Sequence, residues 1–218
     1  MIHVLSNTPS AANEYIAELR DCKVQTDRMR FRDNLRRLGV ALGLELSKRL
    51  KYAPQWVETP LGQCRVERMH EQPVLATILR AGLPLHEGLA SVFDRADQAF
   101  VTACRRYSDA DHSSFEIAIE ALSSPSLTGR ILILADPMLA TGASLVQVAN
   151  AMIQSHGTPS EIHVVAAIAS EQGIQAVASA LPAGSHLWVG AVDPELSDRG
   201  YILPGLGDAG DLAFGPKM

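Results

Sequence analysis

The chain is 218 residues long; 47% of them are hydrophobic and 20% are charged. A chain of this length and apolarity can bury a full core, which excludes intrinsic disorder and predicts one domain over residues 1–218. Apolar runs are far shorter than the roughly 18 residues that cross a bilayer, and no basic-then-apolar leader is visible, so neither a membrane span nor a secretory signal is expected.

The first 70 residues are expected to form helices followed by a β-hairpin. Leucines recur every three or four positions between residues 35 and 50, which predicts helical structure within residues 11–51. Residues 56–69 then read as a hairpin that turns at Leu61 and Gly62.

This first part of the chain is basic, although the net charge of the whole chain is −5. Five arginines form a basic run whose members are Arg28, Arg30, Arg32, Arg36 and Arg37. Asp27 and Asp33 interleave with them, which favours a solvated helix face. A nucleic-acid surface is the alternative, but a sequence pI of about 5.8 speaks against it, so nucleic-acid binding is not expected.

From residue 73 to residue 193, short apolar runs alternate with amphipathic segments. Buried strands are predicted at residues 74–79, 99–104, 131–134, 162–168 and 187–192. Helices are predicted at residues 83–93, 145–156 and 171–181. This alternation predicts the α/β class, with a mostly parallel central sheet flanked by helices. Because ligands bind beyond the carboxyl ends of such strands, the loops after residues 79, 104, 134 and 192 are expected to carry the chemistry.

The strongest chemical signal is ILILADPMLATGAS at residues 131–144. A buried strand leads into Asp136, then into a loop with Thr141 and Ser144, then into a helix. Free N–H groups and hydroxyls at a helix N-terminus suit a phosphate monoester, and the carboxylate before them suits sugar hydroxyls. It is not a Walker loop, because GxxxxGK[ST] is absent. A tight strand–helix turn with a capping serine is the alternative.

The three cysteines, Cys22, Cys64 and Cys104, are scattered and form no CxxC motif. They argue against a disulfide framework or a zinc site and favour a reducing, cytoplasmic location.

The segment DPMLATGAS resembles the ribose-5-phosphate loop of the type I phosphoribosyltransferases. Together with ILRAGLP at 78–84 and GYILPGLGDAGD at 200–211, it resembles the uracil phosphoribosyltransferase family from about residue 15 to the C-terminus. The resemblance implies N-terminal helices and a hairpin arm over 1–70, a core sheet over 73–193 and a C-terminal base-binding hood over 194–218. It also implies a pentosyltransferase that makes uridine monophosphate (UMP) and pyrophosphate from uracil and phosphoribosyl pyrophosphate (PRPP).

The same resemblance implies roles for individual residues. The catalytic residues are expected to be Arg80, Arg105, Asp136 and Asp208. PRPP is expected to contact Arg80, Arg105, Asp136, Pro137, Met138, Leu139, Ala140, Thr141, Gly142, Ala143, Ser144 and Asp208. Uracil is expected to contact Ile202, Gly207, Asp208 and Ala209. Mg²⁺ is the implied cofactor, held by PRPP and, through water, by Asp208.

Two of these positions, Arg80 and Arg105, leave alternatives open, and Ala143 and Pro84 depart from the family pattern. Arg80 follows a buried strand, where it could bind pyrophosphate or pair with a nearby acid. Arg105 opens a polar stretch, 106–125, that is expected to be a loop closing over the pyrophosphate, and Arg106 is its rival. Ala143 stands where the family commonly has glycine, which is tolerable if its φ is negative. Pro84 also replaces a family glycine and is expected in the first turn of the following helix.

Partners follow from the same reading. The hairpin lies outside the strand–helix core, so it is expected to pack against a second subunit in a homodimer or a larger homo-oligomer. The resemblance also implies GTP as a candidate allosteric partner. A nucleotide-sensing regulator of the same fold that binds nucleic acid, or a weakly active family member, remain alternatives.

Overall fold

The computed structural model describes residues 1–107 and 115–216, and the side chains of residues 1–103 and 118–216. Its centre is a sheet whose strands lie in the order β1 (Ile2–Val4), β10 (His186–Asp193), β9 (Glu161–Ser170), β7 (Ile131–Ala135), β4 (Val74–Leu79), β5 (Asp97–Tyr107) and β6 (Phe115–Ser123). These strands are parallel except for β6, which runs antiparallel to β5. The short strand β8 (Met138–Leu139) also pairs with β9. The predicted α/β class with a mostly parallel sheet is confirmed.

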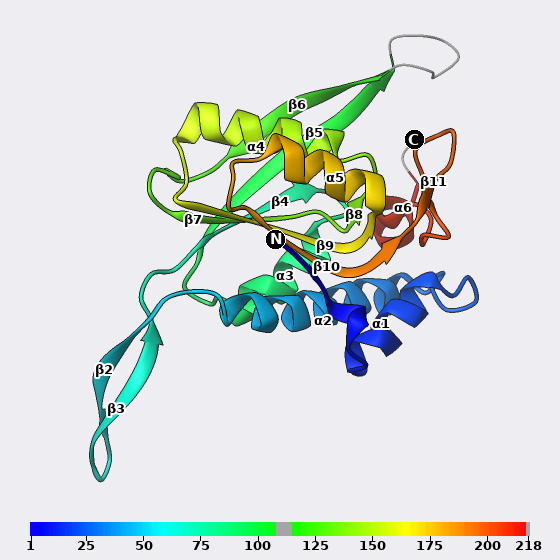
Figure 1. Ribbon diagram of the computed structural model, residues 1–218. Coiled ribbons are helices and arrows are strands. Elements are labelled where there is room, and N and C mark those ends of the chain that lie inside the picture. The colour runs from blue at the N-terminus through cyan, green and yellow to red at the C-terminus, as the bar shows by residue number, and fades with distance from the viewer. Residues whose placement is uncertain (108–114, 217–218) are drawn as a thin grey trace.

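Helices cover both faces of this sheet (Figure 1). On one face lie α1 (Ala11–Arg20), α2 (Arg28–Ser47) and α3 (Leu83–Val92), and on the other lie α4 (Ala143–His156) and α5 (Glu171–Ala180). Successive strand residues enter alternate cores: Ile133 packs in the first, whereas Leu132 and Leu134 pack in the second. This two-sided burial explains why the strands are continuously apolar rather than alternating.

The sheet has its topological switch point between β4 and β7. The chain continues from β4 through α3 to β5 on one side, whereas β7 pairs on the other side of β4 and leads into α4. Helices α3 and α4 therefore leave adjacent strands toward opposite faces. The carboxyl ends of β4 and β7 consequently border a crevice, the usual ligand position in an open α/β sheet.

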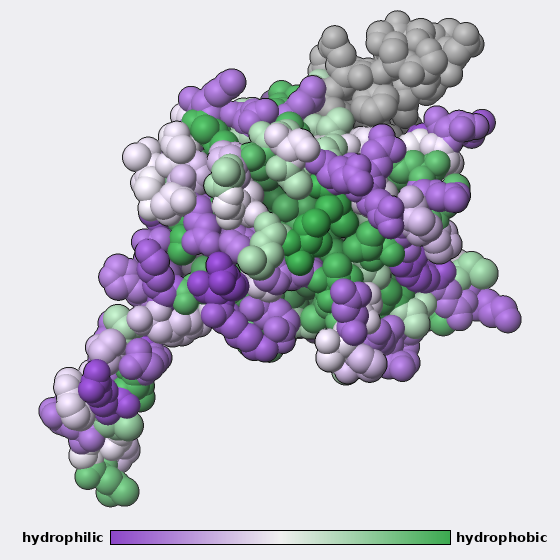
Figure 2. Space-filling model, in the orientation of Figure 1, coloured by the Kyte–Doolittle hydropathy of each residue, from purple (hydrophilic) through white to green (hydrophobic). Residues whose placement is uncertain are grey.

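The predicted hairpin is present as a separate two-stranded sheet of β2 (Tyr52–Thr59) and β3 (Gly62–Met69). It projects from the body as an arm (Figure 1). Its side chains include the exposed Tyr52, Trp56 and Leu61, and Figure 2 shows apolar surface at its tip. A lone two-stranded hairpin is marginally stable in water, so exposed aromatics on it suit burial against another surface.

Two expectations need correction. The single helical stretch at 11–51 is two helices, because residues 21–27 break it and Asp27 caps α2 by accepting hydrogen bonds from the N–H groups of Met29 and Arg30. Much of the stretch 106–125, expected as a loop, is instead strand: β5 runs to Tyr107 and β6 covers Phe115–Ser123. Residues 108–114 of the expected loop lie outside the described part of the chain.

The C-terminal region folds back over the end of the sheet as β11 (Glu195–Leu196), β12 (Ile202–Leu203) and α6 (Ala209–Phe214). A short 3₁₀ helix, η1 (Leu5–Asn7), follows β1 near the N-terminus. Within the described ranges, no helix is both long and apolar enough to cross a membrane.

Candidate active site

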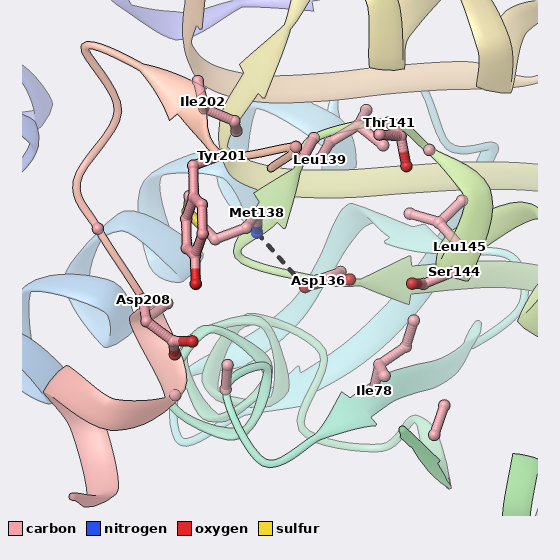
Figure 3. A pocket seen from close by; sticks show the side chains of 18 residues that line it. Ile78, Asp136, Met138, Leu139, Thr141, Ser144, Leu145, Tyr201, Ile202 and Asp208 are labelled. Atoms are coloured by element: carbon pink, nitrogen blue, oxygen red, sulfur yellow. Dashed lines mark hydrogen bonds between the residues drawn. The ribbon is translucent and has the colours of Figure 1, made fainter. Parts of the chain in front are cut away.

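A cleft of about 510 Å³ opens at the carboxyl ends of β4 and β7 (Figure 3). Eleven of the residues predicted for substrates line it: Asp136, Met138, Leu139, Ala140, Thr141, Gly142, Ser144, Ile202, Gly207, Asp208 and Ala209. Three predicted residues with described side chains are not among its lining: Arg80, Pro137 and Ala143. The cleft therefore joins the loop after β7 to the hood, two segments far apart in sequence.

Other lining residues were not singled out from the sequence: Ile78, Ala81, Ala103, Leu145, Gly200, Tyr201 and Gly210. Gly200, Tyr201 and Gly210 belong to the GYILPGLGDAGD motif, so the motif itself was the available signal. Ala103 lies near the end of a strand and is a small apolar residue, so nothing in its sequence context marks it.

The loop after β7 places oxygen atoms and a helix N-terminus at the cleft. Asp136 Oδ1 accepts a hydrogen bond from the Met138 N–H at 3.4 Å (Figure 3). Thr141 Oγ1 accepts from the Ala143 N–H at 3.4 Å, and Ala143 is the first residue of α4. Its helical conformation has the negative φ at which alanine is tolerated. The first turn of α4 leaves backbone N–H groups available to an anion.

This loop rests on the N-terminus of α5. The buried Ser170 hydroxyl donates to the Ala140 carbonyl at 2.6 Å and accepts from the Gly173 N–H at 2.8 Å. Gly173 approaches so closely that a Cβ there would lie 2.2 Å from the Ala140 carbonyl oxygen. Ser170 also pairs in register with Asp193 on the neighbouring strand. The position of the loop is thus set by the end of β9.

Arg80 follows β4, as expected, but its side chain is engaged with the C-terminal region. Its Nη2 donates to the Gly215 carbonyl at 3.1 Å and lies 3.7 Å from Asp211 Oδ1. In the structure Arg80 therefore pairs with an acid, which was the alternative expectation. Its contact with pyrophosphate stays a prediction. Pro84 lies in the first turn of α3, as predicted.

The side chains of Arg105 and Arg106 lie outside the described part of the structure. Their backbones belong to the end of β5 and pair with Ile117 and Glu116 of β6. The choice between the two arginines stays a prediction.

The hood presents backbone and one carboxylate to the cleft. Ile202 is buried, Gly207 has a φ of +90°, and Asp208 caps α6 by accepting from the Asp211 N–H at 3.0 Å. Figure 3 shows Tyr201 and Asp208 on the opposite side of the cleft from Asp136. A side chain at position 207 would be strained by the positive φ, whatever the space around it.

The basic run on α2 is used within the molecule. Arg30 forms a two-pronged ion pair with Glu18, whose pKa falls to about 2 because the guanidinium donates to its carboxylate. Arg32 donates to the Ala213 carbonyl of the hood at 2.7 Å. Arg36 lies 3.7 Å from Asp33, and Arg37 donates to Asn34. These partners agree with an ordinary helix face and weaken the case for a nucleic-acid surface.

A mostly parallel sheet, a cleft at its switch point, a strand–loop–helix turn beside that cleft and a C-terminal segment on its other side are the arrangement of the type I phosphoribosyltransferase fold. Comparison with solved structures agrees. A hypoxanthine phosphoribosyltransferase from Staphylococcus aureus aligns with a TM-score of 0.50 at 16% identity, over 76% of each chain, and shares the fold alone. The AQ2163 protein from Aquifex aeolicus aligns with a TM-score of 0.85 at 32% identity, covering 99% of this chain and 98% of that one.

The family model described as uracil phosphoribosyltransferase matches residues 6–216. A uracil phosphoribosyltransferase from Porphyromonas gingivalis is 43% identical over 96% of this chain and 95% of its own length. One from Pyrococcus furiosus is 38% identical over 94% and 86%, respectively. The chain belongs to the uracil phosphoribosyltransferase family, a family of pentosyltransferases.

Proposed function

We propose that this cleft transfers the 5-phosphoribosyl group of PRPP to uracil, giving UMP and pyrophosphate. The observation that carries the proposal is the single cleft shared by the loop after β7 and the hood. One wall offers a helix N-terminus beside a carboxylate, and the other offers glycine-rich backbone. A ribose phosphate and a base would need these two kinds of wall next to one another.

The chemistry asks the protein for position and charge rather than for covalent catalysis. The bond from C1 of the ribose to pyrophosphate breaks, a base nitrogen bonds to C1, and that nitrogen loses its proton. The N–H groups around Gly142–Ser144 would hold the 5-phosphate, and Asp136 would accept from the ribose hydroxyls. Arg80 and Arg105 would offset the charge of the leaving pyrophosphate, so Arg80 must exchange its contact with Asp211 for the substrate. Such positioning and electrostatic effects can supply many powers of ten in rate.

The donor set of the cleft suits Mg²⁺ brought in by the substrate. Asp136 and Asp208 line the cleft, and no cluster of three or more metal-ligating side chains occurs among the described residues. A magnesium ion with one or two carboxylates nearby usually keeps several waters and substrate phosphates as ligands. When bound, the ion would offset negative charge on the pyrophosphate, while Asp208 would orient a water ligand.

The hood is proposed to select uracil through its main chain. Uracil presents an acceptor at O4 and a donor at N3, and cytosine reverses both. A main-chain N–H facing O4 and a carbonyl facing N3 would leave cytosine with two mismatched pairs, at about 1–3 kcal/mol for each unsatisfied group. Ile202 and Ala209 would supply packing, and Gly207 would supply close backbone approach.

The experiment is turnover of labelled uracil with PRPP and Mg²⁺ by the purified chain, beside salt-dependent RNA binding. Formation of UMP without tight RNA binding is the expected result. Arg105→Ala and Arg106→Ala variants, assayed in parallel, separate the two candidate pyrophosphate contacts. RNA binding without UMP formation would favour the regulatory alternative, and very slow turnover would favour a weakly active family member.

The arm of β2 and β3 is proposed to dock on a second copy of the chain. The exposed Trp56 and Tyr52 on an isolated hairpin support this assignment. Sedimentation across working concentrations tests it, and a monomer throughout would contradict it. A cytoplasmic location, favoured by the exposed free thiols of Cys22 and Cys64, and regulation by GTP stay predictions.

A further inference from the structure

An ion pair lies beneath the hood, outside the lining of the cleft. Arg20, the last residue of α1, faces Asp193, the last residue of β10. The guanidinium is bidentate: Nη1 donates to Oδ2 at 2.8 Å and Nη2 donates to Oδ1 at 2.7 Å. The carboxylate is nearly buried, with 6% of its side chain exposed, and the arginine side chain is 24% exposed.

Both members of this pair also bind the same hood residue. Arg20 Nη1 donates to the Gly205 carbonyl at 2.9 Å, and the Gly205 N–H donates to Asp193 Oδ2 at 3.0 Å. Gly205 has a φ of +62°, and a Cβ there would lie 2.1 Å from the Ile202 carbonyl oxygen. The hood backbone is therefore held at a point where its conformation is unusual and where both of its polar groups are paired.

A second tie reaches the next residue of the hood. Gln25, in the turn after α1, donates through Nε2 to the Leu19 carbonyl at 2.8 Å and to the Leu206 carbonyl at 3.2 Å. The tied residues, Gly205 and Leu206, lie between Ile202 and Gly207, the two segments of the hood that line the cleft. Regular structure in this part of the hood is limited to the two-residue strands β11 and β12, so discrete polar contacts must set its position.

We infer that Arg20 and Asp193 are positioning residues for base recognition: they hold the backbone of residues 202–209 in the position in which it can hydrogen-bond to the base. The inference rests on the proposed function of the cleft. Stability alone is a weak explanation for such a pair, because a buried ion pair is often no better for stability than apolar packing. A bidentate pair whose remaining hydrogen bonds go to one backbone residue instead fixes geometry.

The test uses Asp193→Asn, Arg20→Ala and Arg20→Lys, with Glu18→Gln as a matched control. The control removes a bidentate ion pair between α1 and α2 that does not touch the hood. Asp193→Asn and Arg20→Ala are expected to raise the KM for uracil by at least about tenfold, because charge-assisted hydrogen bonds are lost. The KM for PRPP should stay within about twofold. Arg20→Lys keeps the positive charge but carries its donors on a single nitrogen and cannot form the bidentate pair, so it should recover part of the loss.

Hydrogen exchange of the hood amides provides a readout that does not need activity. Exchange at the amides of residues 202, 203 and 205–207 should become faster in Asp193→Asn and stay unchanged in Glu18→Gln. If Asp193→Asn does not fold, Gln25→Ala, which removes only the tie to Leu206 and Leu19, takes its place with a smaller effect in the same direction. The inference is overturned if hood exchange is unchanged, or if both KM values rise in parallel. If the wild-type protein does not consume uracil but hood amides still exchange faster in Asp193→Asn, the proposed function is refuted and the structural role of the hood contacts is supported.

Discussion

Replacing Ser170 with alanine removes the hydroxyl that joins β9, α5 and the loop after β7. Two hydrogen bonds disappear, at 2.6 Å to the Ala140 carbonyl and at 2.8 Å from the Gly173 N–H. Each buried group left unpaired costs about 1–3 kcal/mol, and the Gly173 bond is also the N-cap of α5, whose loss costs about 1 kcal/mol. Because the cap and the Gly173 bond are the same contact, the free energy of unfolding should fall by about 2–4 kcal/mol. For a chain of this size, that corresponds to a Tm lower by roughly 5–15 °C.

The same change should reach catalysis unevenly. Ala140 lies in the loop assigned to the ribose phosphate, so the KM for PRPP should rise more than the KM for uracil. Thermal unfolding and steady-state kinetics of Ser170→Ala are compared with Ser179→Ala, which removes an exposed hydroxyl bonded to the Gln175 carbonyl on the same helix. If the two variants melt within about 1 °C of each other and share the same KM for PRPP, the reasoning that β9 positions this loop is wrong.

Three further predictions concern the loop, the hood and the sheet. Thr141→Ala should weaken PRPP binding by about ten- to hundredfold, because a hydrogen bond to a charged group is lost. Asp136→Asn should also weaken PRPP binding, because the amide replaces one acceptor oxygen by a donor. An unchanged dependence of the rate on PRPP in Thr141→Ala would contradict the proposed position of the phosphate. Ile202→Ala should lower uracil affinity without changing the preference over cytosine, and competition by cytosine within about tenfold of uracil would refute main-chain reading. Burial lowers the pKa of His163 to about 3, and its Nδ1 accepts from Trp188. Below about pH 6.5 the His163 imidazole is protonated in the unfolded chain but stays neutral in the folded chain. Its contribution to the free energy of unfolding should therefore be complete above about pH 6.5 and decline as the pH falls toward 3. In chemical denaturation, the free energy of unfolding of His163→Gln should depend less steeply on pH.

The strand–helix alternation was predictable because strands buried on both faces are continuously apolar, and each is followed by an amphipathic segment. β6 was missed for the opposite reason. Its sequence alternates apolar and other residues only over positions 115–119, and this short alternation lies at the end of a polar stretch. The break between α1 and α2 had a readable signal, since Asp27 precedes a helical run as a capping residue does.

The walls of the cleft could be predicted from motifs, but their supports could not. Asp136, Thr141 and Asp208 lie in the motifs DPMLATGAS and GYILPGLGDAGD, whose sequences predict a binding role. Arg20 and Asp193 are 173 positions apart, and the sequence around neither residue indicates that the two form an ion pair. Arg80 is a related case: its local position was foreseen, but its contact with Gly215 depends on where the C-terminal region folds back.

The register between β9 and β10 fixes the distance between the two residues that anchor the walls of the cleft. Ser170 and Asp193 are directly paired, and each strand ends there. One residue bonds the loop at Ala140, and the other bonds the hood at Gly205. Neighbouring strands keep a separation of about 4.8 Å, so the anchor points of the two walls share one fixed spacing. A sequence change on the outer surface of either wall can alter its shape, but the distance between the two anchors is inherited from backbone hydrogen bonding, which side-chain substitution leaves intact.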